Sequence, residues 1–154
     1  MNYWDKKLIR EQLDKKLIPL KTLANSGMLE TGWIKSIREA LGMSAKDVAK
    51  KVGIDQSRIS RLENAEKNGN VKLSSLQKIA KGLGMDFVYG IVPKNTLESL
   101  VREQALKIAK EKMKRLTHTM HLELQELSDD EKESALKDMI DKILIDEPKD
   151  FWKK

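Results

Sequence analysis

The chain has 154 residues, of which 40% are hydrophobic and 35% are charged, a balance that predicts a soluble protein with one compact domain and helical extensions. It contains no cysteine and only two histidines, which excludes disulfides and thiolate metal sites and leaves little material for a metal centre or a histidine-based catalyst. No apolar run approaches the roughly 20 residues that span a bilayer, and the first residues show no signal-peptide pattern. We therefore expect a cytoplasmic protein with no membrane contact.

The net charge of +6 is unevenly distributed along the chain. Residues 31–92 carry eleven bases and six acids, whereas residues 129–154 carry six bases and nine acids. Because a charged partner responds to the local field, the middle of the chain is expected to face an anionic partner. The acidic end is either a surface with a separate role or a solvated helix face.

The N-terminal segment, residues 1–30, is predicted to be a helix followed by a linker. Apolar residues are spaced for a helix over residues 2–17. Pro19 is expected to end this helix because proline has no backbone N–H to donate. Small and polar residues then indicate a linker over residues 22–32.

Four short amphipathic helices are predicted within residues 31–84. Ser44, with Asp47 three residues later, is expected to cap the second helix, and Asp55 the third. Glycines end these helices, except that a polar loop over residues 66–70 ends the third. The predicted core residues of the four helices are Ile34, Ile37, Leu41, Val48, Ala49, Val52, Ile59, Leu62, Leu73, Leu76, Ile79 and Leu83.

Residues 85–93 differ because β-branched and aromatic residues predominate, which predicts a short strand over residues 85–92. Its unpaired edge would suit the same strand of a second copy, and an extended segment packed on the helices is an equal alternative.

Within residues 94–154, an apolar stripe predicts one long helix over residues 96–127. Ser128 and Glu131 then predict a capping box for a last helix that Pro148 ends. The expected fold class is all-α with one short β-strand, and the C-terminal helices are expected to bind a second copy or a partner.

Residues 45–64 have the pattern of a helix, a tight turn at Gly53 and a second helix. The small side chain of Ala49 is suited to a close crossing of the two helices. A major groove of DNA admits one α-helix, and Gln and Arg form paired hydrogen bonds with adenine and guanine edges. The second helix presents such residues on its exposed face, which are Gln56, Ser57, Arg58, Ser60 and Arg61.

Residues 33–83 resemble the lambda-repressor-like helix-turn-helix family of the xenobiotic-response-element type, including the ending Ile59-Ser60-Arg61-Leu62-Glu63-Asn64. The resemblance implies that residues 55–64 enter the major groove of double-stranded DNA, usually as a homodimer on an inverted repeat. It implies base contacts by residues at the positions of Gln56, Ser57 and Arg61. The expected phosphate contacts are Ser44, Lys46, Asn64, Lys67 and Lys72.

Two further positions follow from this resemblance. Arg38 and Glu63 match a pair that forms a salt bridge between the first and third helices, so a structural role is expected for both. Ala45 departs from the pattern, because many members have Gln there to support the leading base-reading Gln, which is Gln56 in this chain.

The whole chain looks like the small bacterial group called mobile mystery protein A, in residues 32–34, 87–93 and 118–123. This resemblance implies an antitoxin that binds its own promoter and restrains a toxin with a Fic domain, a fold that commonly transfers AMP from ATP to a protein hydroxyl. Fic inhibitors commonly carry Ser/Thr-x-x-x-Glu-Gly/Asn on a helix. Thr119 and Glu123 fit the first part, although Leu124 replaces Gly or Asn, and residues 26–30 and 99–103 share the spacing.

Other classes of function are also compatible with the pattern. The protein is alternatively a stand-alone regulator, or a protein-binding inhibitor that has lost DNA binding. His118 and His121 are spaced for a metal near Glu123, but no metal site is expected because the chain offers no third histidine and no cysteine. No catalytic motif is found, so neither an enzyme nor a cofactor is expected.

Overall fold

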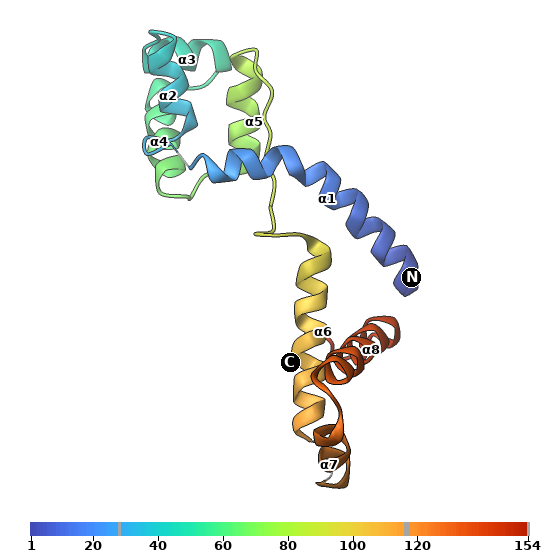
Figure 1. Ribbon diagram of the computed structural model, residues 1–154. Coiled ribbons are helices and arrows are strands. Elements are labelled where there is room, and N and C mark those ends of the chain that lie inside the picture. The colour runs from blue at the N-terminus through green and yellow to red at the C-terminus, as the bar shows by residue number, and fades with distance from the viewer. Residues whose placement is uncertain (28, 116–117, 154) are drawn as a thin grey trace. The chain divides into compact units, whose positions relative to one another are not determined.

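The computed structural model describes residues 1–27, 29–115 and 118–153, except for the side chains of His118 and His121. The described residues form eight helices and no strand (Figure 1). The chain divides into two compact units, one of residues 20–91 and one of residues 1–19 with residues 92–154. The all-α class is therefore confirmed, and the first residues belong with the C-terminal helices. None of the described helices is both long and apolar enough to cross a membrane.

Helix α1 runs from Tyr3 to Asn25 and contains Pro19, so the prediction that it ends before the proline is wrong. A proline inside a helix removes one backbone hydrogen bond. The residues beyond it have apolar neighbours: Leu20 lies against Gly90, and Leu23 lines an apolar hollow. Leu20 is half-buried and its contact offsets part of the lost hydrogen bond, whereas Leu23 remains 48% exposed. The next helix begins only at Trp33.

The four short helices predicted in the middle of the chain are confirmed. They are α2 (Trp33–Ala40), α3 (Ala45–Val52), α4 (Gln56–Lys67) and α5 (Leu73–Gly82). Their apolar faces meet in one core, because each helix alone would leave its apolar stripe in water. The buried residues of this core are Ile34, Val48, Ala49, Val52, Ile59 and Ile79.

The boundary between α3 and α4 is set locally. The Ser44 hydroxyl accepts a hydrogen bond from the Asp47 N–H (3.2 Å) and donates to the Asp47 carboxylate (2.6 Å), which begins α3. Gly53 ends α3 with φ 74° and ψ 41°, a left-handed conformation that glycine adopts without a steric cost. Its N–H bonds the Ala49 carbonyl at 2.9 Å. The turn that follows fixes where α4 starts.

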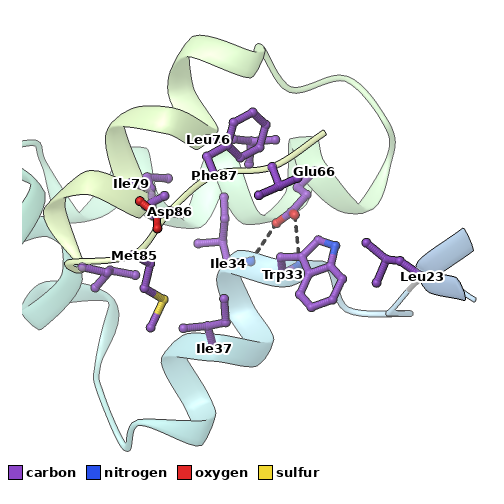
Figure 2. A pocket seen from close by; sticks show the side chains of 13 residues that line it. Leu23, Trp33, Ile34, Ile37, Glu66, Leu76, Ile79, Met85, Asp86 and Phe87 are labelled. Atoms are coloured by element: carbon purple, nitrogen blue, oxygen red, sulfur yellow. Dashed lines mark hydrogen bonds between the residues drawn. The ribbon is translucent and has the colours of Figure 1, made fainter. Parts of the chain in front are cut away.

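Residues 85–92 form no strand, so this part of the predicted fold is wrong. A strand requires a neighbouring backbone with which to exchange hydrogen bonds, and no other described segment pairs with it. Phe87 is half-buried and points into a hollow of about 270 Å³ between α2 and α5 (Figure 2). Val88, Tyr89 and Ile91 are 69%, 64% and 91% exposed. The alternative of a segment packed on the helices therefore holds for Phe87 but not for these three residues.

The C-terminal helices are α6 (Leu97–Lys114), α7 (His118–Glu126) and α8 (Asp129–Asp146). The predicted single helix over residues 96–127 is wrong, because α6 ends at Lys114 and α7 begins at His118. Arg115 is the C-cap of α6, and its N–H bonds the carbonyls of Lys112 and Met113. Helix α8 packs against α6 (Figure 1). The buried core of this unit is made by Ala105, Ile108, Ala109, Ile143, Leu144 and Phe151.

The N-termini of α6 and α8 are capped by residues of the unit to which both helices belong. Thr96 and Ser99 form a capping box at the start of α6, and the predicted box of Ser128 and Glu131 at the start of α8 is confirmed. The Asp14 carboxylate from α1 also accepts the Leu97 N–H at 2.8 Å. This contact ties the first part of α1 to the N-terminus of α6.

Candidate nucleic-acid interface

Helix α4 presents a polar face to solvent. Its opposite face is fixed in the core by Ile59, which is fully buried, and by the half-buried Leu62. The Arg61 Nη2 donates to the Ser57 Oγ at 3.2 Å, so the guanidinium lies along the helix surface. The five residues predicted to read bases are all exposed on this helix, and they are Gln56, Ser57, Arg58, Ser60 and Arg61.

The five side chains do not point in one direction. Successive residues of an α-helix are about 100° apart around its axis. The outermost row, opposite Ile59 and Leu62, is therefore Ser57, Arg61 and Asn64. Gln56 and Ser60 lie on one flank of this row, and Arg58 lies on the other flank.

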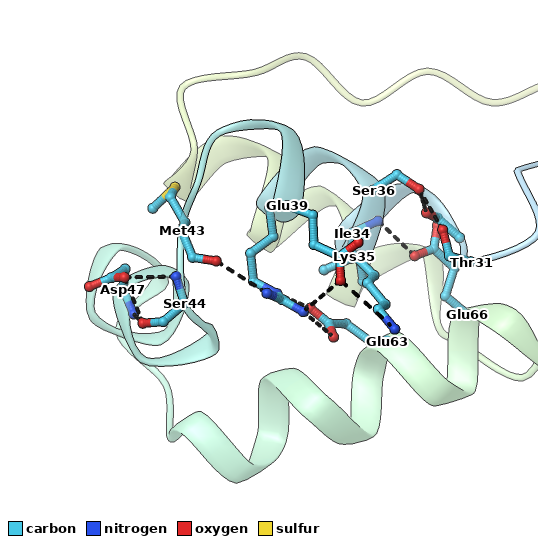
Figure 3. Close-up of polar contacts among 12 residues, drawn as sticks. Thr31, Ile34, Lys35, Ser36, Glu39, Met43, Ser44, Asp47, Glu63 and Glu66 are labelled. Atoms are coloured by element: carbon cyan, nitrogen blue, oxygen red, sulfur yellow. Dashed lines mark hydrogen bonds and ion pairs between the residues drawn. The ribbon is translucent and has the colours of Figure 1, made fainter.

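An ion pair holds α4 against α2. The Arg38 Nε donates to Glu63 Oε1 at 2.6 Å and its Nη2 donates to Glu63 Oε2 at 3.1 Å (Figure 3). The hydrogen bond to Glu63 raises the pKa of Arg38. A third contact, from Arg38 Nη1 to the Met43 carbonyl at 3.1 Å, anchors the loop before α3. The two residues expected to pair are thus joined in a bidentate contact, with Glu63 only 9% exposed.

Glu66 supplies a second connection from α4 to α2. Its carboxylate oxygens accept the N–H groups of Trp33 and Ile34, both at 2.9 Å (Figure 2). These are orphan amides at the start of α2, and the N-cap residue, Gly32, has no side chain to satisfy them. Sequence reasoning placed Glu66 in a polar loop and missed this role. The absence of a capping side chain at Gly32 was the available signal.

The residues predicted to contact phosphates lie on three helices. Lys46 is in the first turn of α3, Asn64 and Lys67 are in the last turns of α4, and Lys72 is the N-cap of α5, all of them exposed. Ser44 differs, because both its hydroxyl and its N–H donate to the Asp47 carboxylate. These two bonds lower the pKa of Asp47. A phosphate at Ser44 would therefore have to compete with that carboxylate.

Ala45 stands where many members of the resembled family have Gln, and this difference affects how Gln56 is held. Ala45 packs against the core of α2–α5 and has no polar group to offer. Gln56 forms no side-chain hydrogen bond with any described residue. Its amide is therefore not held in place before a partner binds.

Thr119 and Glu123, the predicted toxin-inhibitory residues, are both exposed and one turn apart on α7. Of the two other segments with this spacing, Ser26 follows the end of α1, and Ser99 is used in the capping box of α6. The side chains of His118 and His121 lie outside the described residues. Among the described residues, no three metal-ligating side chains cluster.

A family model described as Helix-turn-helix matches residues 34–89. These residues, about a third of the chain, are similar to a helix-turn-helix domain. No curated protein and no solved structure matches the chain. The domain match supports DNA binding and transcription regulation, in a family that is generally non-enzymatic. Helix α4 has the place that the recognition helix takes in this motif.

Proposed function

We propose that this protein is a sequence-specific transcriptional repressor that binds double-stranded DNA. The observation that carries the proposal is the exposed polar row on α4, which the Arg38 and Glu63 pair holds at a fixed position on the domain. A helix that is held in place before binding favours affinity, because fewer groups then have to be ordered on the DNA. The amide of Gln56 is the exception, since it is ordered only on binding. The DNA partner places the proposed activity in the cytoplasm.

We assign different contacts to different parts of the surface. Arg61 is suited to guanine and Gln56 to adenine, because each forms paired hydrogen bonds with that base. Lys46, Lys67, Lys72 and Asn64 are assigned to phosphates, which set affinity and its salt dependence. A recognition helix of this length covers one half-site, so a homodimer on an inverted repeat is proposed.

Footprinting with the full-length protein at low salt tests the proposal. The probe is the DNA upstream of its own gene, with a scrambled duplex of equal length and composition as control. We expect protection of two half-sites about one helical turn apart. Equal binding to both duplexes at matched ionic strength would contradict a sequence-specific repressor.

The sorting of contacts is tested by single substitutions. Arg61→Ala and Gln56→Ala should each weaken operator binding by about 1–3 kcal/mol and relax discrimination at one base position. Lys72→Ala should weaken binding to all duplexes alike and reduce the salt slope by about one. If both kinds of variant behave identically, the division of these residues into base contacts and phosphate contacts is wrong.

We also propose that the repressor acts as an antitoxin, regulating its own operon and restraining a Fic-type AMP-transferase toxin through Glu123. The supporting observation is the surface of α7, where Thr119 and Glu123 share one exposed face and Met120 and Leu122 are each 47% exposed. A charged residue among exposed apolar side chains suits a protein partner. The stand-alone regulator is the alternative.

Co-expression with the neighbouring gene product separates these two functions. We expect the two proteins to co-purify, and Glu123→Ala to restore toxicity. Glu126→Ala, an exposed glutamate on the same helix, is the matched control and should leave inhibition intact. Failure to co-purify favours the stand-alone regulator.

A further inference from the structure

A shallow hollow beside the recognition helix collects positive charge from three helices. It is lined by Lys50 of α3, Arg58 of α4 and Lys78 of α5, around the turn that joins α3 to α4. All three side chains are exposed. None of them forms an ion pair with a described residue.

The acids near this hollow do not balance its charge. Asp55 lines the hollow as the N-cap residue of α4. Asp47 attracts Lys50, but its carboxylate already accepts two hydrogen bonds from Ser44. Three cations therefore face one lining carboxylate, and their mutual repulsion is relieved when an anion enters.

The start of α4 adds to this positive field. The Asp55 side chain makes no capping hydrogen bond to the amides of the first turn. Uncapped amides and the helix dipole both favour a negative group near a helix N-terminus. The hollow thus combines three side-chain cations with an N-terminus that no described side chain caps.

We propose that this hollow holds one backbone phosphate of the DNA, so that Arg58 contacts the backbone and not a base. This assignment rests on the proposed DNA-binding function and names a further contact within it. A helix in the major groove has a phosphodiester backbone on each side. Arg58 lies on the flank of α4 opposite Gln56 and lines the hollow together with Lys50 and Lys78. It therefore faces one backbone when Gln56 and Ser57, at the start of the helix, face the bases.

This contact also has a role in orientation. Because Lys50, Arg58 and Lys78 belong to three helices, a single phosphate held by all three fixes the rotation of the domain on the duplex. Phosphate contacts of this kind set the register of a protein while bases supply the sequence preference. An acidic segment of another protein is the competing occupant, and the test below includes it.

The test compares two double variants of the full-length protein on its operator. Lys50→Ala with Lys78→Ala removes two lining cations, whereas Lys51→Ala with Lys81→Ala removes two exposed lysines of the same helices that do not line the hollow. Both variants change the net charge equally. We expect the first to lower the slope of log affinity against log salt by about 0.9, the amount for one lost phosphate contact, and the second to lower it by less than half of that.

Ethylation interference locates the phosphate directly. Ethylation of one phosphate per half-site should weaken binding of the parent protein and have no further effect on the Lys50→Ala, Lys78→Ala variant. Arg58→Ala should weaken all duplexes alike and leave base preferences unchanged. A change of preference at one base position on Arg58→Ala would overturn the assignment.

The remaining outcomes are distinct. A parent protein that binds its operator while both double variants lose affinity equally overturns the phosphate site and leaves the proposed function standing. The Lys50→Ala, Lys78→Ala variant could instead bind the operator as the parent does but no longer bind an acidic protein partner. That result would assign the hollow to the partner and overturn the proposal. A parent that does not distinguish its operator from scrambled duplex overturns both.

Discussion

Glu63 and Glu66 both extend from α4 toward α2, but they stabilise different features. Glu63 neutralises the guanidinium of Arg38 in a nearly buried site, and Glu66 caps the first amides of α2. Lost burial and lost hydrogen bonds make such residues costly to replace, although neither is assigned to a DNA contact. Both hold α4 against α2, which fixes the direction of the outer row that we propose meets the groove.

Arg38→Ala should lower the free energy of unfolding by about 2–4 kcal/mol, because Glu63 is then left as a nearly buried charge without a partner. Urea denaturation measures this loss. Adding Glu63→Gln to Arg38→Ala should recover part of it. Lys35→Ala on the same helix, where Lys35 forms an exposed ion pair of 3.9 Å with Glu39, should change stability by less than about 0.5 kcal/mol.

Gly32→Ala should destabilise the domain for two reasons. Gly32 has φ 80°, and an added Cβ would lie 2.9 Å from the Glu66 Oε2. Gly27→Ala is the matched control, because Gly27 has φ 83° but nothing within 4 Å of the added carbon. We expect thermal unfolding to show a loss of about 1 kcal/mol from backbone strain in both variants, and a larger loss in Gly32→Ala. Equal losses would mean that Glu66 moves aside without cost.

At the level of helices, side-chain caps set several of the starts, and a left-handed glycine ends α3. Capping boxes begin α3, α6 and α8. The boxes of α3 and α8 contain a carboxylate, whereas the box of α6 contains the hydroxyls of Thr96 and Ser99. Hydrogen bonds from Ser44 and Ser128 lower the pKa of Asp47 and of Glu131 respectively.

These pKa shifts predict how the caps respond to acid. A carboxyl whose pKa is lower in the folded state stabilises the fold above its unfolded pKa and loses that contribution as pH falls through its folded pKa. The difference in melting temperature between the parent and Ser44→Ala or Ser128→Ala should therefore shrink as pH falls from about 5 to about 2. Thr96→Ala should show a difference that does not change with pH, since its box contains no carboxyl.

At the level of the whole molecule, two separate cores support two units. Residues 20–91 pack around Ile59, and the other unit packs around Ile108. Since each unit has its own buried apolar cluster, each is expected to unfold as its own cooperative transition. The proposed DNA-binding surface and the proposed toxin-binding helix belong to different units.

Substitutions in the two cores should therefore have separable effects. Ile108→Ala and Ile59→Ala remove side chains that are 2% and 0% exposed, and each should lower the stability of its own unit by about 2–5 kcal/mol. Calorimetry should show one transition shifted in each variant, and operator affinity at a temperature where both units remain folded should be unchanged in Ile108→Ala. A single transition that moves in both variants would show that the units unfold together.

The sequence by itself determined the helices of the middle domain and the turn between α3 and α4. Ser44, Asp47 and Gly53 act on groups within four residues of themselves, so their spacing is sufficient to place the cap and the turn. Apolar periodicity likewise identified the buried faces of Val48, Val52 and Ile59. The exposed face of α4 followed from the same pattern, because residues outside an apolar stripe must face solvent.

Only the tertiary structure decided the features that join distant parts of the chain. Helix α1 continues past Pro19, where Leu20 and Leu23 have neighbours from residues 33–90. Helix α6 ends at Lys114 although no glycine or proline lies near that residue, and α8 packs on α6. The cap from Glu66 to α2 and the meeting of Lys50, Arg58 and Lys78 also depend on residues far apart in sequence. Local periodicity reports which face of a helix is buried, but it does not report which other helix covers that face, and these features depend on that second fact.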